Sequence, residues 1–86
     1  MHEKIGRRVV DEAVPLLTEV VSEGIRQGIF TCDHIEERVR MILIMSRHLF
    51  DSGNFSEGDI EVFIDIVEKI LGAQAGTLGF IRGLIN

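Results

Sequence analysis

The 86-residue chain contains no tryptophan, no tyrosine, one proline and one cysteine. A single cysteine cannot form a disulfide within the chain, and no cysteine pair has the spacing of a zinc site. The sequence therefore indicates a reducing compartment, and we expect a cytoplasmic protein. No apolar run reaches the length of about 18 residues that crosses a membrane, and the first ten residues do not resemble a signal peptide, so we expect no membrane association.

Basic residues are also scarce, with 9 Lys and Arg against 14 Asp and Glu, which gives a formal net charge of −5. An acidic chain repels phosphate backbones, so we expect no direct binding to nucleic acid. Hydrophobic residues, by contrast, make up 45% of the chain and are mostly aliphatic. A domain of this length buries only about 60–65% of its unfolded surface, so this apolar content exceeds what one small core readily hides.

The apolar residues recur at helical spacing in three long segments, and no segment has a convincing strand pattern. We predict an all-α single domain over residues 1–86, with three long antiparallel helices and a short C-terminal helix. The predicted helices cover about residues 3–27, 34–51, 57–71 and 77–84.

Glycine and capping residues mark the ends of these segments. Gly28 can adopt the left-handed conformation that ends the first helix, and Ile29 or Phe30 can fold back onto that end. Thr31 or Asp33 is the expected cap of the second helix.

The third helix has equally clear signals at both ends. Ser56 and Asp59 have the spacing of a capping box, and Gly72 follows the last apolar residue. Within the first helix, Pro15 removes one hydrogen bond and clashes with the preceding turn. We therefore expect a kink or a break near Ala13 to Pro15.

The second and third helices each carry more apolar residues than one packing face requires. A helix enclosed by its own chain would explain this, but three or four helices can hardly enclose one. The alternative is a two-fold contact between two copies, through two helices of each, which forms a dimeric four-helix bundle. The side chains predicted to lie at this contact are Met41, Ile44, Met45, His48, Val62 and Ile66.

Several of these segments resemble the C-terminal part of tetracycline-repressor (TetR) family transcriptional regulators. The resemblance covers about Val9 to Gly76. It rests on "VPLLTEVVSEGIRQGIF", with Pro15-Leu16-Leu17, Glu23-Gly24 and Gly28-Ile29-Phe30, and on the later run from Val67 to Ala73.

The resemblance implies a regulatory domain that dimerises through its last two long helices and holds an effector between helices. The basic helix-turn-helix that binds DNA in that family has no counterpart in residues 1–86. We therefore expect a ligand-responsive dimerisation domain without its DNA-binding part; the alternative is a free-standing helical interaction module with no link to DNA. A small apolar effector would contact Val14, Leu17, Val21 and Met45.

The polar residues give no reason to expect an enzyme. His34 and His48 lie fourteen residues apart, which is about 21 Å along a helix, so they cannot share a metal ion. Cys32 is better explained as a small turn residue than as a redox-sensing thiol, because the neighbouring acids disfavour a thiolate. No Ser–His–Asp set and no phosphate-binding loop is evident, and we expect no cofactor.

Overall fold

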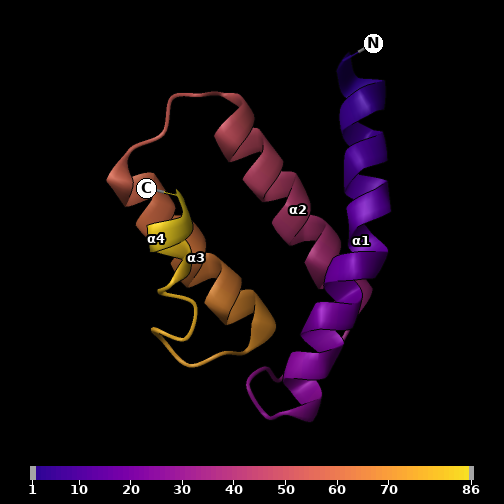
Figure 1. Ribbon diagram of the computed structural model, residues 1–86, viewed down its shortest axis with the longest axis vertical. Helices are drawn as coiled ribbons and strands as arrows, with labels where there is room; N and C mark the ends of the chain where they lie inside the picture. The colour runs from indigo at the N-terminus through magenta and orange to yellow at the C-terminus, as the bar shows by residue number, and fades with distance from the viewer. Residues whose placement is uncertain (1, 86) are drawn as a thin grey trace.

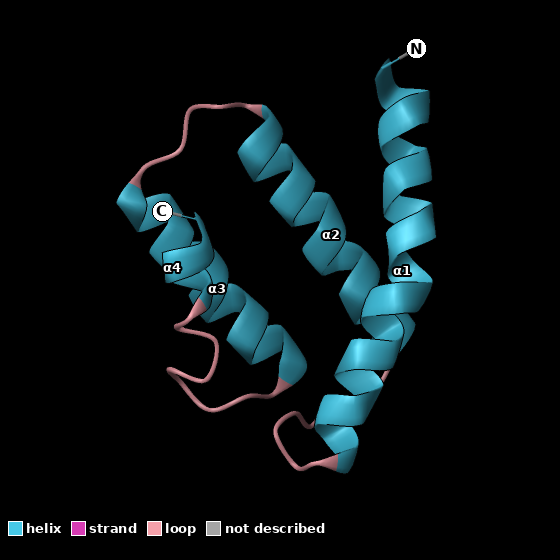
Figure 2. Ribbon diagram, viewed as in Figure 1, coloured by secondary structure: helices cyan, strands magenta, loops and turns pink. Residues whose placement is uncertain are grey.

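The computed structural model describes the backbone of residues 2–85 and the side chains of residues 8–84. Over residues 2–85 the chain forms four helices and no strand (Figures 1 and 2). In chain order the helices are α1 (His2–Arg26), α2 (Ile35–Asp51), α3 (Glu57–Leu71) and α4 (Ile81–Ile85). The all-α class is confirmed, and the three long helices begin and end within one residue of the predicted positions.

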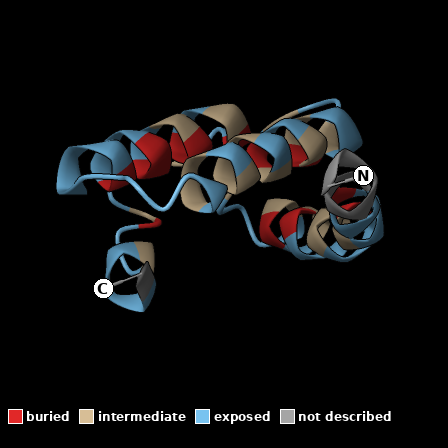
Figure 3. Ribbon diagram, turned by 90° about the horizontal axis from the view of Figure 1, so that it is seen from above, coloured by how far each residue is buried: buried red, intermediate tan, exposed pale blue. Residues whose placement is uncertain are grey.

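Successive long helices run in opposite directions (Figure 1). α2 and α3 lie side by side in one layer, and α1 and α4 lie on the same side of that layer (Figure 3). α1 crosses the beginning of α2 and diverges from α2 toward the N-terminus (Figure 1). The body is flat, with extents of 39 × 28 × 17 Å, and its radius of gyration of 13.2 Å exceeds the roughly 12 Å expected for a compact chain of this length.

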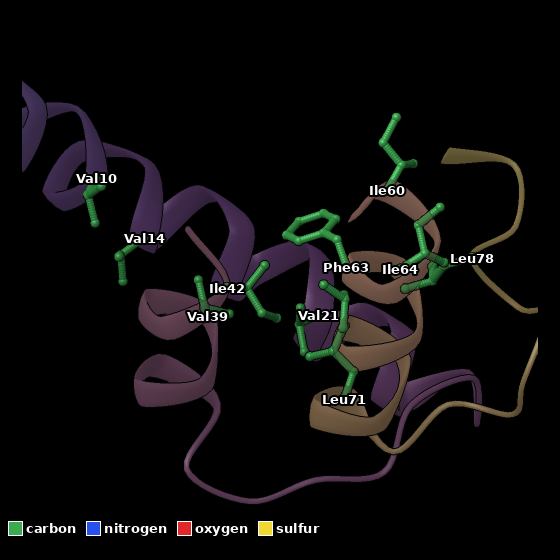
Figure 4. Packing of buried hydrophobic residues seen from close by; sticks show 11 residues of the cluster. Val10, Val14, Val21, Val39, Ile42, Ile60, Phe63, Ile64, Leu71 and Leu78 are labelled. Carbon is green, nitrogen blue, oxygen red and sulfur yellow. The ribbon is translucent and has the colours of Figure 1, made fainter. Parts of the chain in front are cut away.

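The hydrophobic core is small and lies where the three long helices meet (Figure 4). Its only aromatic member, Phe63, makes an edge-to-face contact with the half-buried Phe50 at a centroid distance of 5.9 Å. The buried members are Val10, Val14, Val21, Val39, Ile42, Ile60, Phe63, Ile64, Val67, Leu71 and Leu78. Each long helix therefore contributes one narrow stripe, and the rest of its apolar surface lies outside the core.

The turn between α1 and α2 is fastened to the C-terminal end of α3. The Thr31 N–H donates to the Leu71 carbonyl oxygen at 3.0 Å, and Arg38 Nη1 donates to the Ile70 carbonyl oxygen at 2.8 Å. A helix leaves its last carbonyls without partners inside the helix, so these two donors satisfy groups that would otherwise lack one. We call this pair of hydrogen bonds the α3 latch.

Arg38 also organises the beginning of α2. Its Nε donates to the Asp33 carbonyl oxygen at 2.7 Å, and its Nη2 donates to Asp33 Oδ1 at 3.0 Å. Hydrogen bonds from the neighbouring His34 and from Arg38 lower the pKa of Asp33. His34 is the N-cap residue of α2 and has a φ of 49°, but its side chain makes no capping hydrogen bond. The expectation that Thr31 or Asp33 caps α2 was therefore wrong: Thr31 bonds to α3, and the Asp33 carboxylate is held by Arg38.

The end of α1 follows the sequence more closely. Gly28 has a φ of 80°, and the Phe30 ring folds back against Gly24, where a β-carbon would overlap it. Pro15 does not break the helix, because α1 is continuous from His2 to Arg26. Figure 1 shows the axis of α1 changing direction about midway. Of the two outcomes expected near Pro15, the structure therefore has a kink and not a break.

α3 has a complete cap at each end. The Asp59 N–H donates to Ser56 Oγ at 3.1 Å, and the Ser56 N–H donates to Asp59 Oδ2 at 2.8 Å, which confirms the predicted capping box. At the other end Gly72 is left-handed at φ 67°. A β-carbon on Gly72 would also overlap the Thr31 backbone, so the α3 latch requires glycine at this position.

The segment after α3 is held back against α3 by two carboxylates. The buried Glu68 accepts a hydrogen bond from the Leu78 N–H at Oε2, at 2.7 Å. Arg82 Nη2 lies 2.7 Å from Glu61 Oε1. The final helix is shorter than the predicted 77–84, because residues 75–80 form turns before Ile81.

Gly72→Ala is expected to destabilise the fold more than Gly28→Ala. Both glycines are left-handed, which costs alanine about 1 kcal/mol, but only Gly72 lacks room for a β-carbon. Urea unfolding should place the Gly72→Ala free energy of unfolding at least about 1 kcal/mol below that of Gly28→Ala. Equal losses for the two variants would contradict the close approach of Thr31 to Gly72.

Glu68→Ala is expected to release the segment after α3, because the buried Leu78 N–H loses its acceptor, at a cost of about 1–3 kcal/mol. Glu68→Gln keeps an acceptor oxygen and should retain most of the stability. Glu61→Ala, which removes an exposed ion pair, should cost less than about 1 kcal/mol. Amide hydrogen exchange at Leu78 reports the release; unchanged exchange in Glu68→Ala would contradict it.

Candidate association surfaces

Several apolar side chains of α2 and α3 remain partly or largely exposed. Met41 is 59% exposed and Val62 is 58% exposed, while Met45, Ile66 and Ile70 are half-buried. Met41 and Ile70 line one shallow cavity of about 280 Å³, so these parts of the two helices are neighbours. We call these five residues the α2–α3 outer face.

Two of the residues predicted with this group lie elsewhere. Ile44, which is half-exposed, and His48, which is exposed, line a groove between α2 and α1. The sequence placed them with Met41 because all three lie opposite the core-facing side of α2. Only the position of α1 shows that this broad side is divided between two surfaces.

The groove occupies the space where α1 and α2 diverge, and its volume is about 830 Å³. Val10 and Ile44 supply its apolar lining, and Arg47 is paired with Asp51 at 3.2 Å. Its lining residues are Val10, Asp11, Arg40, Ile44, Arg47, His48, Asp51 and Ser52. A volume of this size is within the range of small-molecule sites.

The residues predicted to contact an effector do not line this groove. Val14 and Val21 are buried in the core, and Leu17 and Met45 pack against it. On α1, the residues that line the groove are Val10 and Asp11, one turn before Val14. The sequence shows which residues of α1 are apolar, but the divergence of α1 from α2 depends on tertiary packing.

A second apolar surface lies on α1. Val9, Leu16 and Val20 are 58%, 68% and 61% exposed, and Ala13 lies between them, half-buried. We call these four residues the α1 stripe. The sequence placed them in one broad apolar arc together with the core residues, so helical periodicity identified the arc but not the part that stays uncovered.

Several charged side chains form pairs near the surface. Arg26 Nη2 donates to Glu23 Oε1 at 3.0 Å, and this hydrogen bond lowers the pKa of Glu23. Among the described side chains, no three His, Cys, Asp or Glu residues lie close enough to hold a metal ion. Within the described part of the chain, no helix is long and apolar enough to span a membrane. Cys32 is a half-buried free thiol that packs against the core.

The chain exposes 6217 Å² of surface. A compact monomer of 9.7 kDa exposes about 5,100 Å², so the excess is roughly 1,100 Å². Comparisons with protein-family models, with curated proteins and with solved structures found no match.

Proposed function

We propose that this chain is a homodimerisation domain and that the α2–α3 outer face is its interface. The observation that carries the proposal is the exposure of Met41 on α2 and Val62 on α3, with Met45 and Ile66 of the same two helices only half-buried. Contiguous apolar patches of a few hundred Å² on a small protein are typical of association sites.

The surface area supports the same proposal. A standard interface covers about 800 Å² on each partner, and the exposed surface exceeds that of a compact monomer by roughly 1,100 Å². The body is only 17 Å thick in its shortest direction. A second α2–α3 layer placed on the first forms a four-helix bundle, which is a common geometry for antiparallel helix pairs.

The resemblance to TetR-family regulators supports a more specific proposal. The domain would hold two copies of a regulator together, and an effector in the groove between α1 and α2 would change the angle between those helices. Residues 8–84 carry no basic recognition helix, and the chain is acidic, so the domain itself would not bind DNA.

Met41→Glu combined with Val62→Glu is expected to convert the dimer into a monomer, because two charges per subunit would become buried in the interface. Analytical ultracentrifugation should show the dimer dissociation constant raised by at least about 100-fold, with helicity retained in circular dichroism. Ile29→Glu is the matched control, because Ile29 is exposed in the turn after α1 and should leave the dimer intact.

Two outcomes would contradict the proposed interface. A wild-type chain that is monomeric at tens of micromolar would exclude the dimer. Loss of helicity in the double variant would show that these side chains belong to the core. A monomer that binds a helix of another protein is the result expected of a free-standing interaction module.

The groove is expected to bind a small amphiphilic molecule, because Val10 and Ile44 offer apolar surface beside the charged side chains of Asp11, Arg47 and Asp51. The probe is 1-anilinonaphthalene-8-sulfonate, followed by amide chemical-shift mapping. Ile44→Trp should fill the groove and weaken probe binding at least about tenfold. Val62→Trp, on the α2–α3 outer face, should not. Shifts confined to the α2–α3 outer face would contradict a groove site.

A further inference from the structure

Two adjoining hollows lie between α1 and α2, and both border only one half of α1. The larger is the groove of about 830 Å³, and the smaller has a volume of about 310 Å³. Val10, Arg47 and Asp51 line both of them, and every residue that α1 contributes to either one precedes Pro15. Beyond Pro15 the helix is packed on the core, where Val21 is only 2% exposed. The two halves of α1 therefore differ in how closely they are held against α2.

Pro15 sets the direction in which the first half of α1 can turn. Proline has no N–H for the Asp11 carbonyl oxygen, and its ring clashes with that carbonyl, so the helix opens on the proline side. Pro15 is exposed, and the opened side therefore faces solvent. In Figure 1 the first half of α1 is accordingly turned toward α2, relative to the line of the second half. Further bending at Pro15 moves the first half closer to α2 and narrows both hollows.

The two walls of the groove complement each other. Val10 and Asp11 form the wall on α1, while the wall on α2 includes Ile44 and Arg47. Each wall thus combines an apolar side chain with a charged one, and the two charges are opposite. Ile44 is 49% exposed, so closing the groove buries apolar surface that water now reaches. Arg47 Nε lies 3.2 Å from the Asp51 carboxylate, which leaves the two Nη groups of Arg47 for Asp11.

We propose that residues 8–14 of α1, which we call the α1 lid, turn about Pro15 and close the groove when it is empty. The inference rests on the proposed groove site, because it concerns how that site opens and closes. A small molecule in the groove fills the space into which the lid turns, so binding holds the lid open. The change in helix angle is thereby assigned to a hinge within α1, and the half beyond Pro15 stays on the core.

The expected movement is large enough to measure. A change of about 20° is on the scale of a proline kink. Arg8 lies seven residues before Pro15, which is about 10 Å along the helix axis. Such a turn therefore moves Arg8 by about 3–4 Å. Glu19 lies beyond the hinge and does not move.

Double electron–electron resonance between two spin labels tests the position of the α1 lid. Labels on Arg8→Cys and Glu57→Cys, with Cys32→Ser to remove the native thiol, measure the lid against the beginning of α3, beyond α2 in Figure 1. Excess unlabelled protein suppresses distances between copies. Added 1-anilinonaphthalene-8-sulfonate should lengthen the mean distance by about 3–4 Å, because the lid opens. The matched pair Glu19→Cys with Glu57→Cys should show no change.

Three variants test the hinge without any probe. Pro15→Ala supplies the missing N–H and removes the ring clash, so the helix straightens and the distance from the lid label should lengthen by a similar amount. Asp11→Lys places a cation opposite Arg47 and should lengthen the same distance. Glu12→Lys makes the same charge change at a position that lines neither hollow, and should leave the distance unchanged. Circular dichroism should show that all three variants retain their helicity.

The outcomes distinguish the lid from the groove site. If the probe shifts groove amides but leaves the lid distance unchanged, the groove binds ligands and the lid is wrong. If the probe does not bind in the groove, the proposed site is wrong, and the variants alone decide the lid. An unchanged distance in either Pro15→Ala or Asp11→Lys overturns the hinge. A change in the control pair at Glu19 shows that α1 moves as a whole, which also overturns it.

Discussion

The α3 latch is the constraint on which the arrangement of the helices depends. The Thr31 N–H and the Arg38 guanidinium reach the last carbonyls of α3, and Thr31 can approach α3 so closely because Gly72 has no side chain. These bonds place the beginning of α2 beside the end of α3, so the two helices run antiparallel in one layer. Among the described side chains, no hydrogen bond or ion pair joins the opposite end of α2 to α1, and there the two helices diverge and leave the groove.

A second constraint is the small size of the core. The long helices offer broad apolar arcs, but the core takes one stripe from each. Closing the remaining surface within one chain would require more helices than the described residues supply. The apolar surface left over is divided into the α2–α3 outer face and the α1 stripe, with the more polar groove between α1 and α2. The α2–α3 outer face and the groove account for the function proposed here, which is association and response to a ligand rather than catalysis.

Much of the local structure could be predicted because it depends on neighbouring residues. The capping box of α3 is formed by Ser56 and Asp59, which are three residues apart. The left-handed turns that end α1 and α3 each fall on a glycine, Gly28 and Gly72. The beginning of α2 could not be predicted in this way. Thr31 is a good cap by residue type, but its backbone N–H bonds to Leu71, forty residues later.

The sequence by itself determined that the chain is helical, where its three long helices begin and end, and that its apolar residues exceed the needs of one small core. Tertiary structure alone decided which of those residues stay exposed. Periodicity assigns a side chain to one side of its own helix, but it contains no information about the neighbouring helix. Ile44 and Met41 therefore had the same signal in the sequence, and the crossing of α1 over α2 placed them on different surfaces.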